Sequence, residues 1–214
     1  MRARRSVLLV AAVAATSACS LSDLSGLSGG DEAEAPGGDG GEADGDAPDR
    51  RGVAPGDAGG GDADCVARAH GPRRPQVVAN VGAGVAWTSP DNARFADNAS
   101  ATVALDGNRS RELVLYDFGF AVPAGALVLG VELSVLRSAT DVDEIVDTSV
   151  RLARDKIGTG DSRASSAPWG TSMVEFTYGG PRDTFGQALT AADVNAAGFG
   201  ASLAVEHVGT TGES

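Results

Sequence analysis

Residues 127–135 read LVLGVELSV, and this stretch decides the fold. Every second residue is apolar, and the residues between them include glycine, glutamate and serine. Successive side chains of an extended strand point to opposite faces, so a period of two is typical of a strand with one buried face. The core-facing set is Leu127, Leu129, Val131, Leu133 and Val135.

A second alternating stretch covers residues 146–152. Val146, Thr148, Val150 and Leu152 would share the buried face of this strand. The alternation then predicts that Asp147, Ser149 and Arg151 point outward.

Further β-prone runs occupy 77–81, 101–105, 112–118, 173–178 and 200–208, and turn-forming Gly, Pro, Asn and Asp residues separate them. The spacing of Thr190 and Asp193 is that of a capping box, which predicts one short helical turn. Seven or eight short strands without helices between them predict an all-β fold, an antiparallel β-sandwich.

The segment before this domain has a different composition. Residues 20–64 contain no aromatic residue but thirteen of the 30 glycines, and they carry twelve acids and two arginines, a net charge of −10. Such a segment buries too little apolar surface to offset its chain entropy. We expect a disordered acidic linker over residues 20–75 and a single folded domain over residues 76–214.

The N-terminal residues 1–19 carry three arginines, followed by an apolar run over residues 7–15. Nine residues are too few to span a bilayer as a helix, but they suit a secretory signal. Thr16-Ser17-Ala18-Cys19 then resembles the lipobox of bacterial lipoproteins, with threonine where that family usually has leucine. The resemblance implies cleavage before Cys19, a covalent lipid such as palmitate on its sulfur, and a membrane anchor. Ser20 at the next position favours the outer membrane or cell surface.

Two alternatives concern the cysteines. The signal could be a plain secretory one with an incidental cysteine, and Cys19 could pair with Cys65 in a disulfide. If Cys19 is lipidated, Cys65 is a free thiol, pairs with another chain, or has a partner that is missing from this sequence.

The folded part resembles a known module in the order and spacing of several motifs. They are Trp87-Thr88-Ser89-Pro90-Asp91-Asn92-Ala93, Phe118–Ala126 continuing to Glu132, Val150-Arg151-Leu152, Trp169, Tyr178-Gly179-Gly180, Asp183-Thr184-Phe185-Gly186, Leu189–Asn195 and Phe199-Gly200. This is similar to a jelly-roll-like β-sandwich found in phage structural proteins and bacterial surface proteins. The resemblance implies no established catalysis. Since that family continues into a further apolar strand, it also implies that the domain lacks its last strand.

Four aromatic residues are candidate ligand-binding residues. Trp87, Trp169, Tyr116 and Tyr178 could stack against the flat apolar faces of sugars. The alternative is that each tryptophan plugs one end of the sandwich, with its indole N–H bonded to a loop carbonyl.

An acidic cluster is the candidate metal site. Asp141, Asp143, Glu144 and Asp147 lie close in sequence, and oxygen-rich loops bind calcium in extracellular modules. The cluster lacks the glycine and distal glutamate of an EF-hand, so a solvated acidic loop is the alternative. No other cofactor is expected.

The whole chain has a formal net charge of −12, which argues against nucleic acid as a partner. The sequence contains no nucleophile elbow, zinc-protease motif or phosphate-binding loop. We therefore expect a non-catalytic surface lipoprotein that binds a glycan or an envelope or extracellular protein. The alternatives are a structural or assembly component that pairs through an edge strand, and a secreted hydrolase.

Overall fold

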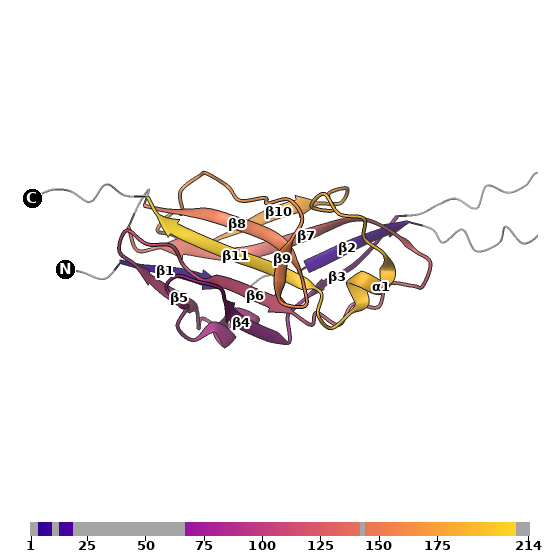
Figure 1. Cartoon of the computed structure of the whole chain (residues 1–214), viewed down its shortest axis with the longest axis horizontal. Helices are drawn as coiled ribbons and strands as arrows, with labels where there is room; N and C mark the ends of the chain where they lie inside the picture. Colours follow the sequence, from indigo (N-terminus) through magenta and orange to yellow (C-terminus); the bar gives the residue numbers. More distant parts are fainter. Residues whose placement is uncertain (1–3, 10–12, 19–66, 142–143, 209–214) are drawn as a thin grey trace, which may run out of the picture. The chain divides into compact units, whose positions relative to one another are not determined.

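The computed structural model describes residues 4–9, 13–18, 67–141 and 144–208. Its strands form two antiparallel sheets, which confirms the predicted all-β sandwich (Figure 1). The first sheet holds β1 (Arg4–Leu9), β2 (Val13–Ala18), β3 (Arg68–Arg73), β5 (Ala101–Leu105), β7 (Leu127–Ala139) and β10 (Val174–Gly180). The second holds β4 (Val77–Val81), β6 (Glu112–Tyr116), β8 (Ile145–Arg154), β9 (Ile157–Thr159) and β11 (Gly200–His207).

Eight of these strands, β4 to β11, lie within the predicted domain and include all seven runs that the sequence indicated. The second sheet has the order β4-β6-β11-β8-β9, and every strand pair in both sheets is antiparallel. Two short helices complete the described fold, the 3-10 helix η1 (Pro90–Arg94) and α1 (Ala191–Asn195).

The core lies between the two sheets. Leu133 and Val135 of β7 and Leu203 and Val205 of β11 are among its fully buried members. Burying a side chain of this size contributes about 1.5–3 kcal/mol relative to leaving it exposed. The predicted alternation therefore holds at Val131, Leu133 and Val135. It is wrong at the start of β7, where Leu127 is exposed, Leu129 is half-buried and Val128 is buried, because a register shift against β2 leaves Leu129 as an extra residue.

The predicted capping box is present at α1. The Thr190 side chain accepts a hydrogen bond from the Asp193 backbone N–H, and the Asp193 carboxylate accepts one from the Thr190 backbone N–H at 2.9 Å. The single helical turn expected here is thus confirmed.

The outward orientation predicted for Asp147 and Ser149 is wrong, because both side chains are buried. Between β8 and β11 the register shifts so that Ala204 opposes Ser149 while Val205 opposes Asp147, which leaves Thr148 as an extra residue. An extra residue reverses the faces of the side chains before it relative to those after it. Asp147 therefore shares the buried side with Ile145, whereas Val146 and Thr148 are half-buried.

β3 lies within the segment expected to be linker. Its side chains are mostly exposed, and its backbone pairs with β2. Hydrophobic periodicity does not detect a strand that is held by backbone hydrogen bonds alone. Residues 19–66, which hold most of the expected linker together with Cys19 and Cys65, lie outside the described residues.

Residues of the expected signal segment form two strands in the first sheet. β1 pairs with β5 and β7, and β2 pairs with β7 and β3. Residues 1–20 and 66–214 belong to one compact unit.

Candidate functional site

A buried charged cluster joins β7 to β8 inside the sandwich. Arg137 occupies the core-facing position two residues after Val135 and is only 3% exposed. Its Nη1 donates to both carboxylate oxygens of Asp147, at 3.0 and 2.8 Å. A buried ion pair is stable only when its remaining hydrogen-bonding groups are also satisfied.

Asp147 meets that condition through three more donors. The Trp169 indole N–H donates to Oδ1 at 2.8 Å, the Tyr178 hydroxyl to Oδ2 at 2.9 Å, and the Ser165 backbone N–H to Oδ2 at 3.1 Å. Burial, and next the adjacent Asp147 carboxylate, raise the pKa of the Tyr178 hydroxyl far above its usual range. The hydroxyl therefore stays protonated and continues to donate to Asp147.

Aromatic rings enclose the Arg137 side chain. Its guanidinium carbon lies 3.8 Å from the centre of the Phe176 ring and 5.2 Å from that of Trp169. Such contacts favour a desolvated cation over an aromatic face. The arrangement is a closed structural network that ties the two sheets together.

The four candidate aromatic residues do not come together as one exposed platform. Trp169 and Tyr178 meet at Asp147, and they are 1% and 2% exposed. Trp87 is 2% exposed, and its indole N–H donates to the Arg111 carbonyl at 3.0 Å. Tyr116 is half-buried beneath Lys156, whose Nζ lies 5.4 Å from the ring centre. Trp87 thus has the loop-carbonyl bond expected of a plug, while Trp169 bonds a carboxylate instead.

The acidic cluster is also divided. Asp141 is exposed and accepts a hydrogen bond from Thr140, Glu144 lies 3.5 Å from His207, and Asp147 is committed to the buried network. Asp143 lies outside the described residues. Over the part of the chain that the structure describes, no group of three or more acidic, histidine or cysteine side chains is placed to hold a metal ion.

A second ion pair fixes the loop after β10. Arg163 donates to Asp183 through Nε at 2.6 Å and through Nη2 at 2.8 Å, and the Phe185 backbone N–H donates to the same carboxylate at 2.8 Å. The hydrogen bonds from Arg163 hold the pKa of Asp183 below its usual range, and the pKa of Arg163 is raised in return. Since the pair is partly exposed, its role is to position the loop.

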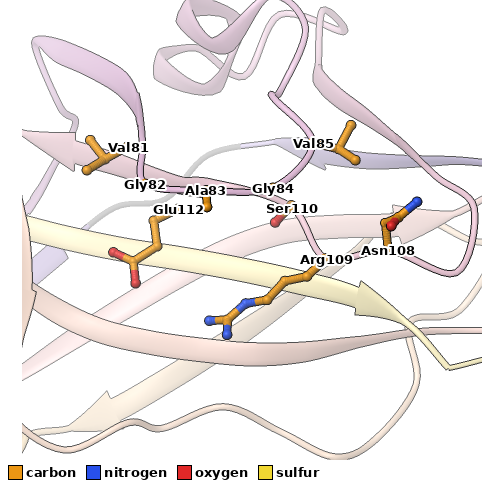
Figure 2. A pocket seen from close by; sticks show the side chains of 9 residues that line it. All are labelled: Val81, Gly82, Ala83, Gly84, Val85, Asn108, Arg109, Ser110 and Glu112. Atoms are coloured by element: carbon orange, nitrogen blue, oxygen red, sulfur yellow. The ribbon is translucent and has the colours of Figure 1, made fainter.

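A surface hollow of about 620 Å³ lies among the described residues, where the turn after β4 meets the segment that leads into β6. Figure 2 shows the side chains of Arg109 and Glu112 reaching to the same side of this segment. The hollow is lined by Val81, Gly82, Ala83, Gly84, Val85, Asn108, Arg109, Ser110 and Glu112.

Hydrogen bonds hold the two walls of the hollow in place. Val85 donates its N–H to the Arg109 carbonyl at 3.0 Å, and Arg111 donates its N–H to the Val85 carbonyl at 2.8 Å. A β-carbon at Gly84 would collide with the backbone of Arg109 and Ser110, so this close approach requires glycine. The hollow is therefore preformed, and it offers one cation, one anion and several backbone groups.

Three residues central to these arrangements were missed by the sequence analysis: Arg137, Arg163 and Arg109. For Arg137 the sequence does contain a signal, because continuing the alternation from Val135 places it on the buried face. A buried cation needs an acidic partner, so a buried acid could have been expected nearby. Nothing in the local pattern indicates the partner of Arg163, which lies 20 residues away in sequence.

The fold and these sites define an antiparallel β-sandwich with a buried arginine–aspartate network. Comparison with protein families, with curated proteins and with solved structures gives no match to this chain. Among the described residues, no helix is long and apolar enough to cross a bilayer.

Proposed function

We propose that this chain is an exported lipoprotein whose β-sandwich binds a partner at the outer membrane or cell surface without catalysing a reaction. The basic residues, short apolar run and Cys19 at the N-terminus support export and lipidation. The glycine-rich acidic linker that follows suits a domain held away from a membrane.

The observation that carries the binding role is the preformed hollow beside Arg109 and Glu112. Stacking on a sugar needs an exposed aromatic face. Trp87, Trp169 and Tyr178 are buried, and the half-buried Tyr116 has Lys156 over its ring. The hollow instead offers backbone groups and opposite charges, which complement a polypeptide. A protein partner is therefore favoured over a glycan.

The proposal is tested by probing the full chain, displayed on beads, against outer-membrane and secreted proteins and against a glycan array. An Arg109→Ala/Glu112→Ala double variant should bind its protein ligand about tenfold more weakly, since central contacts of this kind are worth more than 1 kcal/mol. The matched control is Arg74→Ala, which removes an exposed arginine outside the hollow. Equal binding by both variants would exclude the hollow as the site, and glycan binding alone would reverse the preference for protein.

The anchor has its own test. Labelled palmitate should be incorporated into the full chain, lost in Cys19→Ala and retained in Cys65→Ala. Two or more acyl chains are needed for a stable anchor, so Cys19→Ala should also release the protein from membranes. Retention of label in Cys19→Ala would refute lipidation at this position.

A structural or assembly role through edge pairing is the second candidate. Among the described strands, β10 pairs on one side only, with β7, and Met173 and Val174 at its start are 43% and 48% exposed. An edge of this kind can template another strand. Concentration-dependent association in analytical ultracentrifugation would support the role, and a monomer at all concentrations would count against it.

A further inference from the structure

β1 and β2 lie one after the other along the same edge of β7. β2 pairs with residues 127–133 of β7, and β1 pairs with residues 136–139. β10 pairs with residues 131–137 and so overlaps both of them. A strand has only two edges, which means that β1 and β2 share the edge opposite β10 (Figure 1).

β1 is an interior strand of this sheet. The order is β3-β2-β7-β1-β5, so β5 is joined to the rest of the sheet through β1. On the side of β5 that faces away from β1, Thr102 exchanges both backbone hydrogen bonds with Thr88, at 2.6 and 3.0 Å. Hydrogen-bonding direction alternates along an antiparallel strand, so the backbone groups of Ala101 and Val103 face β1.

Core residues stand on both sides of this position. Ala101, Val103 and Leu105 of β5 and Val131, Leu133 and Val135 of β7 are each at most 1% exposed. Removing β1 and β2 would leave an interior slot bordered by unpaired backbone groups along β5 and along the thirteen residues of β7. Buried N–H and C=O groups without partners are strongly unfavourable, so the slot requires an occupant.

The register indicates that another strand could replace β1 in this slot. We call residues 1–18, which contain β1 and β2, the leader. Arg4, Ser6 and Leu8 stand at the positions opposite Leu105, Val103 and Ala101. Residues directly opposite one another in a sheet share a face, and here that face is the core. At two of these three positions of β1, the residue is arginine or serine. An apolar residue there would bury more apolar surface.

The linker is unsuited to take the place of the leader. Residues 20–64 are rich in Gly, Asp and Pro, which are depleted in strands. A second copy would bring the same linker, and its sandwich strands already pair within their own sheets. The fitting occupant is an extended segment of a different polypeptide, with apolar residues at alternate positions.

We propose that this slot is a strand acceptor: the leader fills it in the precursor, and a strand of another envelope polypeptide inserts antiparallel to β7 after processing. The inference rests on the proposed export, because only loss of residues 1–18 empties the slot. The inserted strand would form backbone hydrogen bonds with β5 and β7 and place its alternate apolar residues on the core face.

A nicked full chain tests the exchange. A protease site inserted among residues 35–50 and then cut should leave the leader fragment bound in size-exclusion chromatography. Labelled peptides of residues 1–18 are then added as competitors. The Arg4→Val/Ser6→Val peptide should displace the fragment at a concentration about tenfold below that of the native peptide, because it adds apolar surface to the core.

Two further peptides serve as controls. Arg5→Val makes a similar change at a position between the core-facing ones, and it should compete like the native peptide. Val7→Pro removes a backbone donor in the middle of β1 and should fail to compete. Equal competition by Arg5→Val and Arg4→Val/Ser6→Val, or no displacement by any peptide, would overturn the proposal. Self-association of the nicked chain in place of peptide binding would assign the slot to a second copy and overturn it as well.

Hydrogen exchange on the uncut chain provides a second measurement. Backbone amides of residues 136–139 should be protected in the native chain and lose protection in Val7→Pro, because Val7 pairs with Ser138 on the β7 side of β1. Unchanged protection of residues 136–139 in that variant would show that β1 does not hold this edge of β7. These experiments use unlipidated protein and leave the hollow unchanged, so their failure is distinct from failure of the proposed function.

Discussion

At the scale of single residues, the buried Asp147 has a structural role, because it holds four other residues in place. It accepts hydrogen bonds from Arg137, Trp169, Tyr178 and Ser165, so its oxygens are fully used. A carboxylate in this state is unavailable to coordinate a metal ion. In this fold Asp147 therefore cannot serve as one of the calcium ligands that the acidic cluster was predicted to supply.

Asp147→Asn should strongly destabilise the fold. The substitution keeps the side-chain shape, but it leaves Arg137 buried without a compensating charge, which costs about 3–5 kcal/mol. The free energy of unfolding from urea titration provides the measurement. Glu175→Gln makes the same chemical change at an exposed position of β10 and should fall within about 0.5 kcal/mol of the parent. A loss below about 1 kcal/mol for Asp147→Asn would contradict the described network.

At the scale of elements, alternation was a reliable guide to where strands lie and a weaker guide to which way side chains point. Residues 127–135 and 200–207 lie in strands as predicted, because their apolar side chains pack into the core. The bulge at Thr148 arises from pairing with β11, which lies about 50 residues away in sequence. Local periodicity contains no information about that register, so the orientation of Asp147 could not be predicted.

The strands missed by the sequence analysis share a different cause. β3 is exposed and polar, and it is defined by backbone pairing with β2. The apolar run at the N-terminus suits a secretory signal and a strand equally well, because hydrophobicity favours both. The candidate sites were harder still: Arg163 and Asp183 meet only through the fold, and Trp87 and Trp169 look alike in sequence whether they are buried or exposed.

The close pairing of β11 with β6 gives a prediction at the element scale. A β-carbon at Gly200 would collide with the Leu115 carbonyl of the neighbouring strand, whereas one at Gly170 would meet no atom within 4 Å. Gly200→Ala should therefore cost about 1–3 kcal/mol through overpacking and backbone displacement. Gly170→Ala should leave the melting temperature within experimental error. Equal stability of the two variants would mean that β11 and β6 are farther apart than described.

At the scale of the whole molecule, most of the net negative charge lies in residues 20–64, before the β-sandwich domain. Residues 20–64 carry a net charge of −10 out of −12 for the chain. Acidic residues that are close in this segment repel one another within a distance of about 8 Å at physiological salt. Within the domain, acids such as Asp183 and Asp193 are instead paired with Arg163 and Arg154.

This pairing predicts how stability depends on pH. The folded-state pKa of Asp183 is lowered, chiefly by its hydrogen bonds from Arg163, and that of Asp193 is lowered chiefly by Thr190. A carboxyl group with a depressed folded-state pKa binds a proton more readily when unfolded, so it stabilises the fold above the usual value of 3.8. That contribution is lost as pH falls from about 4 through the lowered folded-state value.

Asp183→Asn should therefore flatten part of the acid limb of the stability profile measured by urea titration between pH 2 and pH 7. The parent chain should lose stability steeply below about pH 4, and the variant less steeply, because one proton-linked group has been removed. Arg163→Met should flatten the profile in the same way, since it removes the partner that lowers the pKa. If both variants keep the parent slope, this ion pair does not contribute to acid sensitivity, and the loop after β10 is held by its backbone and apolar contacts alone.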